Sequence, residues 1–344
     1  MEKLETTLKA LKQEVNVIGR VHTIDLTEDE DKNGNERIRG YVSVLVKEKI
    51  DNDVREHVIR LNVYSRKFTN AGKENGLYKG YKTVLDEYKS IAETGNEKEA
   101  DLVHVTGSIT LNEYISDNGK HEKSNRISAG FFNRITPENA KKLKGPKATA
   151  VVEMVVDKFK DELDSEGLPT GNVIVKGYTV DFFGDLRENS KPIIPIEAWV
   201  KEGMADKLKE LYEEGSTGKL TLKINNYAKE PSEDEVSEIQ DDMGSFGEAE
   251  DISDVAVEFV NNLEIIGGRA PYDNGKAYTE EQQKEAKEWR EKAIQSLEES
   301  YIPDDKVGFD EVKEEKKETK KEEPKKTELV SDSLPDFDDE ELDF

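Results

Sequence analysis

The amino-acid sequence predicts an all-β-dominated protein with minor helix, built from two similar five-stranded barrels in tandem and ended by a disordered acidic tail. Three observations lead to this prediction. Alternating runs rich in Val, Ile, Thr and Tyr, bounded by turn residues, recur through residues 14–136 and again from 149 onward. In each half, one helical pattern follows the third run. From residue 301 onward the chain is dominated by Lys, Glu and Asp, a composition typical of disorder.

The chain begins with an expected amphipathic arm, residues 1–13. Leu4, Leu8 and Leu11 have helical spacing there, so a short helix is predicted. The strand pattern of the first domain, residues 14–136, starts directly after this arm.

The first domain contains five runs with strand character. A helical pattern at 81–92 separates the third run from the fourth, and Ser116–Gly119 is a hairpin turn sequence before the fifth. The order of three strands, a helix and a hairpin is that of the five-stranded OB-fold barrel. The strands are expected at 15–24, 37–47, 57–64, 102–114 and 126–135.

One segment of this domain is more specific than the pattern alone. Residues 105–120, VTGSITLNEYISDNGK, carry Gly107 inside a strand, where the absence of a side chain permits the sharp coil of a small barrel. The segment resembles the bacterial single-stranded DNA-binding protein (SSB) family, in which a Gly-containing strand leads through a Tyr to an Asp/Gly hairpin. The resemblance covers residues 14–136 and implies binding of single-stranded DNA.

The second half repeats the first. Thr217–Leu222 matches Thr106–Leu111, and the matches at 177–180 with 40–43 and 194–199 with 59–64 follow in the same strand order. We therefore expect a basic linker at 137–148 and a second OB-fold domain at 149–300. This domain contains a helix at 204–212, an acidic insertion at 230–254 and a C-terminal helix at 279–300. Thr279 and Gln282 form a capping box that opens the last helix, and Trp289 is expected to pack it onto the barrel.

The last residues form an acidic tip on the tail, which spans 301–344. Residues 331–344 hold seven carboxylates and no basic residue, with apolar side chains among the acids. The tip resembles that of the SSB family, which ends in aspartates and a terminal Phe, but here Pro335 is far from Phe344 instead of adjacent to it. The resemblance implies docking of replication or recombination proteins, and a purely solubilising tail is the alternative. The expected docking residues are Phe337, Asp338, Asp339, Leu342, Asp343 and Phe344.

The net charge of -26 does not exclude a nucleic-acid partner, because its distribution is uneven. Residues 228–344 hold 38 acidic and 15 basic side chains, which leaves 39 and 36 in residues 1–227. A nearly neutral body can present a basic groove while the C-terminal part dominates the total.

Several other classes of protein are disfavoured. The chain has no cysteine, and its four histidines are scattered, so no disulfide, metal site or cofactor is expected. No apolar run is long enough to span a membrane, and a cytoplasmic location is expected. No combination of nucleophile, base and orienting residue stands out, so the protein is not expected to be an enzyme.

Single strands are bound by cationic grooves with aromatic faces on which bases stack. Basic and aromatic residues interleave most densely in the first domain, and Phe68 and Tyr78 fall in an expected polar loop, 65–80, where core packing would not explain them. The second domain is more acidic and is expected to bind more weakly. The expected contacts are Arg20, Arg37, Arg39, Arg60, Tyr64, Arg66, Lys67, Phe68, Lys73, Tyr78, Lys79 and Tyr81, with Trp199 and Lys201 in the second domain.

Two functions therefore remain. The first is a single-stranded DNA-binding protein, acting as a monomer or small homo-oligomer and coating exposed strands in replication, recombination or repair. Because bacterial SSBs usually carry one OB fold per chain, the tandem layout suggests a phage or another mobile replicon, with the host cytoplasm as location. RNA stays open as a ligand, since discrimination depends on contacts near the 2′-hydroxyl. The second is an acidic protein-interaction or DNA-mimicking module with OB-like domains that bind no nucleic acid.

Overall fold

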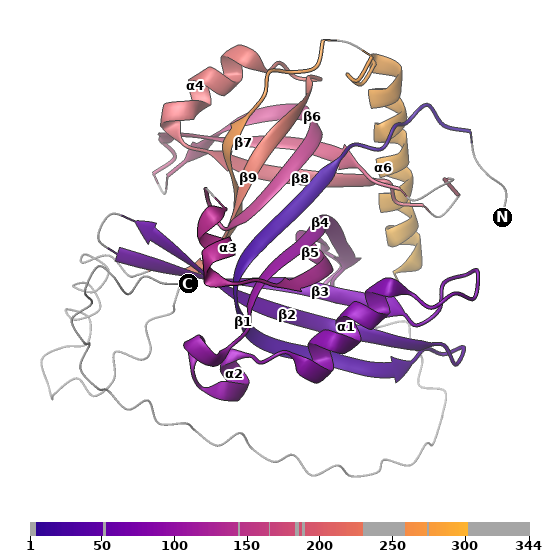
Figure 1. Ribbon diagram of the computed structural model, residues 1–344. Coiled ribbons are helices and arrows are strands. Elements are labelled where there is room, and N and C mark those ends of the chain that lie inside the picture. Colours follow the sequence, from indigo (N-terminus) through magenta and orange to yellow (C-terminus); the bar gives the residue numbers. More distant parts are fainter. Residues whose placement is uncertain are drawn as a thin grey trace, which may run out of the picture.

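The computed structural model describes residues 5–301 apart from 51–52, 144, 165, 183–185, 188–189, 230–258 and 274. The expected acidic insertion and the expected tail with its docking tip therefore lie outside the described residues. Within the described part the predicted fold class is confirmed, because strands predominate and form two barrels with a few helices (Figure 1).

The first barrel closes through five strands in the order β1-β2-β3-β5-β4, with β4 returning to β1. Only β3 and β5 pair in parallel, over Leu61–Ile127 and Asn62–Ser128. Helix α1 (Gly76–Glu87) lies between β3 and β4 in the chain, followed by the short α2 (Ile91–Thr94) and a 3₁₀ turn. This is the OB-fold topology. The strands are β1 (Gln13–Glu30), β2 (Glu36–Ile50), β3 (Asp53–Arg66), β4 (Leu102–Ile115) and β5 (His121–Arg134).

The second barrel repeats this topology in the order β6-β7-β8-β10-β9, with β9 returning to β6. Its parallel pair is β8 and β10, and α4 (Glu202–Leu211) occupies the place of α1. Short helix α3 (Pro137–Lys142) joins the barrels, and α6 (Glu280–Ser300) follows the last strand. The strands are β6 (Ala148–Leu163), β7 (Pro169–Val180), β8 (Ile193–Val200), β9 (Thr217–Ala228) and β10 (Phe259–Gly268).

Strand alternation builds each interior. In β3, His57, Ile59, Leu61, Val63 and Ser65 are buried, whereas the residues between them face outward. A Cβ on Gly107 would lie 2.3 Å from the carbonyl oxygen of Ser128, so only glycine allows β4 and β5 to approach this closely.

The internal repeat occurs on the predicted strands but in a different register. A register shift follows Val21 in β1 and Val156 in β6, so these two residues correspond. Val21 pairs with Val44, and Val156 pairs with Gly177, so Gly177 corresponds to Val44 and not to Gly40.

The other two sequence matches are shifted in the same manner. Val44 pairs with Ile59 and Gly177 with Ile196, so Ile59 corresponds to Ile196 and not to Ile194. By the pairing of β1 with β4 and of β6 with β9, Thr106 corresponds to Thr221 and not to Thr217. Each shift is by an even number of residues, which keeps inward and outward faces matched and explains why the sequences looked alike.

The two barrels are joined edge to edge by β1 and β6. Val15 pairs with Ala150, its own counterpart in the repeat, and Gln13–Val152 and Val17–Ala148 flank this central pair. Equivalent residues therefore pair with one another, so the junction has the two-fold character of an interface between identical subunits. In Figure 1, β1 runs diagonally from one barrel to the other.

The N-terminal arm is extended instead of helical over its described residues 5–12, so the predicted helix is wrong. Leu8 and Leu11 are buried against the second barrel beside Trp289, and the Leu11 amide donates to the Val180 carbonyl at 2.8 Å. Contact with a neighbouring barrel outweighs the helical spacing of a segment this short.

Helix α6 begins at the capping box of Thr279 and Gln282 and buries Trp289 in the same cluster. It extends beside both barrels (Figure 1). Near its C-terminal half, Arg290 binds Glu113 of β4, and the Tyr301 hydroxyl donates to the Asp117 carbonyl at 2.8 Å. The helix thereby holds the β4–β5 hairpin of the first barrel. No helix in the described ranges has the length and apolar character to cross a membrane.

Candidate nucleic-acid interface

The outward side of β2 and β3 carries a cluster of arginine and tyrosine. Cross-strand pairing places Arg37 opposite Arg66, Arg39 opposite Tyr64, and Ser43 opposite Arg60. Because Ile38, Val42, Ile59 and Leu61 fill the interior, alternation directs the polar partners to the surface. We call this surface the arginine face, defined by Arg37, Arg39, Tyr41, Arg60, Asn62, Tyr64 and Arg66.

The arginine face presents ring surface as well as charge. The side chain of Tyr64 is 54% exposed, and the Arg60 guanidinium lies 3.7 Å from the centroid of the Tyr41 ring. Among the described residues, Arg60 has no carboxylate within ion-pair distance. The face therefore combines a cation without a carboxylate partner and exposed aromatic surface, the two components that single-strand binding uses.

Three of its arginines lie beside acids near the end of β1 and in the turn that follows it. Asp29 accepts hydrogen bonds from Arg37 at 2.7 Å and Arg39 at 2.9 Å, and Asp31 lies 3.2 Å from Arg66. The bonds from Arg37 and then Arg39 lower the pKa of Asp29 to about 2, so this carboxylate is ionised at neutral pH. Such partly exposed pairs are weak, and a phosphate can compete with the acid for the guanidinium groups.

The loop after β3 adds Phe68, whose side chain is 52% exposed. The Lys67 ammonium lies 5.8 Å from the centroid of the Phe68 ring and 2.8 Å from Glu36. Lys73 is exposed in the same loop, while Lys79, on α1, pairs with Glu74. Phe68 is therefore available for stacking next to the arginine face.

The expectation that Tyr78 lies in a polar loop is wrong, because α1 begins at Gly76 and buries it to 4% exposure. Tyr81, on the same helix, is 1% exposed and donates to the Ala129 carbonyl at 2.7 Å. Burial raises the pKa of each phenol to about 12, for Tyr78 with a further contribution from its bond to Glu28. Neither ring offers a face to a base. Arg20 is half-buried and donates to the Ala100 carbonyl at 2.8 Å, apart from the arginine face.

The matching surface of the second barrel has a different charge pattern. Trp199 is half-buried and donates its indole N–H to Glu162 at 3.0 Å, and Lys201 lies 3.0 Å from Glu264. Lys176 on β7 pairs with Glu197, its cross-strand neighbour on β8, at 2.8 Å. Each of these cations therefore has a carboxylate partner on the same surface.

Sequence reasoning missed several residues of this region. Asn62 lies in the middle of the arginine face and donates to the Ile127 carbonyl at 3.2 Å, and Arg126 lies outward on β5, the parallel neighbour of β3. Phe131, also on β5, is 59% exposed. An alternating pattern that includes partly buried Ile127 and buried Ala129 would have placed Arg126 on the outside. Only the correct pairing of β5 places Arg126 next to β3.

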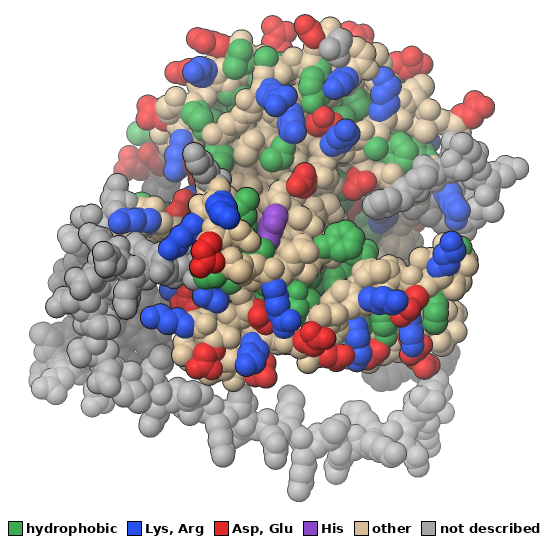
Figure 2. Space-filling model, in the orientation of Figure 1, with side chains coloured by type: hydrophobic (Ala, Val, Ile, Leu, Met, Phe, Trp, Pro, Cys, Tyr) green, Lys and Arg blue, Asp and Glu red, His purple; other side chains and the backbone are tan. Residues whose placement is uncertain are grey.

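Acidic and basic side chains are interspersed over both barrels on the side shown in Figure 2, so no broad field of one sign covers it. Across the described ranges, no group of three or more His, Asp or Glu side chains is arranged to hold a metal ion. The arginine face is therefore distinguished by its local composition and not by the charge of the whole molecule.

Comparison with protein families gives one match that spans most of the chain: the family model described as YorF matches residues 12–300. The chain belongs to the YorF family. The match includes both barrels and α6 of this YorF chain. No curated protein matches the sequence.

The solved structures to which the chain is similar include single-stranded DNA-binding proteins. The wild-type protein from Thermus aquaticus is 10% identical with a TM-score of 0.45, and the alignment covers 77% of the YorF chain and 96% of the other. A small single-stranded DNA-binding protein from Streptomyces coelicolor is 14% identical with a TM-score of 0.25, and the alignment covers 40% of the YorF chain and 99% of the other. The assignment of the OB fold rests on the strand pairing described above.

Proposed function

We propose that this protein binds single-stranded DNA through the arginine face of its first barrel. The observation that carries the proposal is the placement of four arginines and two tyrosines on the outward side of β2 and β3. In OB folds this side of the second and third strands is the usual surface for oligonucleotides.

The chemistry of the face suits a single strand better than a duplex. Bases that are not paired can stack on Tyr64 and on Phe68, each contact contributing about 1–3 kcal/mol, while guanidinium groups bind the phosphates. Such contacts read no base edges, so binding would be independent of sequence. The protein would act by coating exposed strands, without catalysis.

The biological role proposed here is protection of single strands in replication, recombination or repair, in the cytoplasm of a bacterium or of a phage host. Partner proteins would dock on the acidic tip, residues 331–344, through Phe337, Leu342 and Phe344. The support for this part is the sequence pattern alone, since apolar anchors among acids suit a basic, apolar pocket on a partner.

Titration of the full chain with fluorescently labelled oligo-dT tests the function directly. Anisotropy should report tight binding that weakens as salt is added, and a duplex of the same length should bind much more weakly. Oligo-rU of matched length shows whether the 2′-hydroxyl matters. If the labelled strand does not bind at low salt, the alternative holds, and the barrels serve protein contacts instead.

The tip is tested by changing Phe337, Leu342 and Phe344 to Ser with every acid retained. Capture of replication or recombination proteins should fail, while affinity for oligo-dT stays unchanged. Deletion of 331–344 should in addition tighten DNA binding at low salt, because it removes a tethered polyanion that competes for the arginine face. Capture that survives the triple change would reduce the tip to a solubilising segment.

A further inference from the structure

The junction of β1 and β6 leaves two seams between the barrels, one on each side. In one seam β9 packs on the first barrel. Lys223 binds Glu48 at 2.6 Å, the Tyr227 ring lies 5.2 Å from the imidazole of His57, and Arg55 lies 4.1 Å from the Tyr227 centroid. A cavity of about 310 Å³ remains there.

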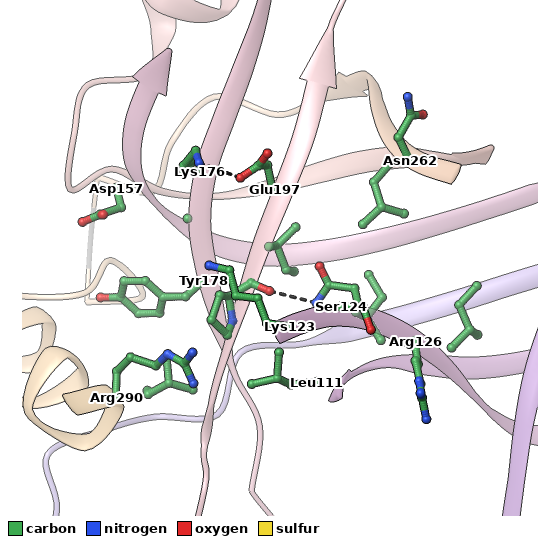
Figure 3. A pocket seen from close by; sticks show the side chains of 18 of the residues that line it. Leu111, Lys123, Ser124, Arg126, Asp157, Lys176, Tyr178, Glu197, Asn262 and Arg290 are labelled. Atoms are coloured by element: carbon green, nitrogen blue, oxygen red, sulfur yellow. Dashed lines mark hydrogen bonds and ion pairs between the residues drawn. The ribbon is translucent and has the colours of Figure 1, made fainter. Parts of the chain in front are cut away.

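The two-fold character of the β1–β6 junction relates the opposite seam to this one, but the opposite seam is open. The β4–β5 hairpin of the first barrel reaches over the second barrel. Asn125 of the hairpin donates to the Pro195 carbonyl at 2.8 Å, and Glu113 of the hairpin binds Arg290 of α6. Between the hairpin and the second barrel lies a groove of about 680 Å³ (Figure 3). One wall is the hairpin, and the other is formed by β7, β8, β10 and α6.

Trp199 supplies aromatic surface to this groove. Its indole N–H donates to Glu162, which also accepts from Asn172 at 2.8 Å and Thr170 at 2.9 Å. The one polar atom of the indole is thus satisfied by a carboxylate that is itself held in place. What the ring offers to the groove is apolar surface in a fixed position, which suits stacking.

The hairpin wall supplies positive charge. Lys123 and Arg126 line the groove, and within the described ranges neither has a carboxylate within ion-pair distance. The cations of the opposite wall are paired: Lys176 with Glu197 and Lys287 with Asp157. The charge available for a polyanion is therefore on the hairpin.

Arg126 also connects the groove to the arginine face. It lies two residues before Ser128, which pairs with Asn62, so Arg126 and Arg60 are on the same side of the neighbouring strands β5 and β3. Neighbouring strands are about 5 Å apart, less than the length of one extended nucleotide. A strand lying on the arginine face can reach the groove without a gap.

We infer that the groove between the barrels is a second single-strand site, in which phosphates bind Lys123 and Arg126 while a base stacks on Trp199. The inference rests on the proposed function, since the strand enters from the arginine face. It assigns to the first barrel's hairpin a role in the binding site of the second barrel. A site of this kind exists only in the joined, two-barrel chain.

Tryptophan emission separates this inference from the function itself. The chain has two tryptophans, and Trp289, on the buried side of α6, is only 7% exposed, so quenching on binding would report Trp199. A strand of about 30 nucleotides, long enough for two OB folds, should quench the emission. In Trp199→Phe the strand should still bind by anisotropy, but the quenching should disappear.

Affinity provides the second readout. Trp199→Leu should weaken binding of the long strand by roughly five- to 150-fold, the range for one stacked base, and should leave a strand of about six nucleotides unaffected on the arginine face. Lys123→Gln with Arg126→Gln should flatten the slope of log K against log salt by about 1.4 for the long strand. Lys209→Gln with Lys284→Gln removes two exposed cations elsewhere and serves as the control.

The inference is overturned if the long strand binds by anisotropy without quenching, and Trp199→Leu and the hairpin double variant bind like the intact chain. The function would then stand on the arginine face alone. If the intact chain binds no strand of either length, the function and the inference fail together. Thermal melting of each variant shows whether the fold is kept, and the hairpin variant, which changes exposed side chains, decides the question if Trp199→Leu does not fold.

Discussion

The outward faces of β2–β3 and of β7–β8 occupy equivalent places in the two barrels, yet they carry different chemistry. By the pairing of the strands, Arg60 corresponds to Glu197, Tyr64 to Lys201 and Asn62 to Trp199. The exposed cation of the first barrel is replaced by an acid that binds Lys176 in the second. A shared fold therefore does not imply equal binding, because binding depends on the side chains that the fold presents.

The difference also indicates how much each barrel would contribute to the binding of short and of long strands. The first barrel offers an open face on which Arg60 has no carboxylate partner among the residues that the structure describes, while the second offers a groove in which Trp199 is held and the charge comes from the first barrel. We expect the first face to dominate the affinity for short strands and the groove to contribute only to longer ones.

The largest effect is expected from giving the first face the residues of the second. Arg60→Glu with Arg39→Asn should weaken binding of a short oligo-dT by about 100-fold or more at low salt, since each hydrogen bond to a charged group contributes about 1.5–3 kcal/mol. Anisotropy titration measures the change. The reverse substitution, Glu197→Arg, should tighten binding of the long strand. Loss of affinity in both variants would contradict the claim that these side chains cause the difference between the two faces.

A smaller effect is expected from the exposed ring. Tyr64→Leu should weaken binding by about tenfold, within the range for a stacked base, without changing the salt dependence, because stacking releases no counterions. Phe68→Leu should act in the same way. The matched control is Tyr78→Leu, which removes a buried ring: it should lower the melting temperature but leave affinity per folded molecule unchanged. An equal loss of affinity in the control would restore Tyr78 to the binding site.

A gain of affinity is expected from Asp29→Asn. The change removes the carboxylate that Arg37 and Arg39 share, so both become available to phosphates and binding should tighten severalfold at low salt. The pKa of Asp29, about 2, means that the ionised form is the one removed at any pH used for binding. Unchanged affinity would show that these arginines do not contact the strand.

The smallest effect concerns the closed seam that fixes the two faces relative to each other. Burial lowers the pKa of His57, which lies beside Glu48, Lys223, Arg55 and Tyr227. Folding favours the neutral imidazole, so its contribution is complete above about pH 6.5 and is lost as the pH falls toward the lowered value. Thermal melting should therefore show a steeper loss of stability below pH 6.5 in the intact chain than in His57→Gln.

Much of the fold followed from periodicity. Alternation predicted the strands of both barrels, and the place of the helix predicted the OB topology, because these patterns reflect which side of a strand is buried. The register of the repeat did not follow from periodicity. Gly40 and Gly177 lie in similar short sequences, but their partners on the neighbouring strand are not equivalent. Partners on distant strands are set by bulges and pairing, which a short sequence match does not contain.

The site was predictable to the extent that it follows the strands. Arg39, Arg60 and Tyr64 were expected as contacts, and the pairing of β2 with β3 brings them onto one face. Tyr78 was misplaced because its polar neighbours hid the start of α1. The groove could not be predicted, since it depends on how the first barrel's hairpin lies over the second barrel. No sequence pattern within either half of the chain predicts a contact between the two barrels.

Photo-crosslinking of a short strand to the intact chain tests the central claim most directly. A halogenated oligo-dT of about six nucleotides, too short to cover two OB folds, should select the stronger site. Peptide mapping should then find the crosslinks on residues 53–68, at Tyr64 and Phe68. Crosslinks confined to residues 169–203 of the second barrel would contradict the assignment of single-strand binding to the arginine face.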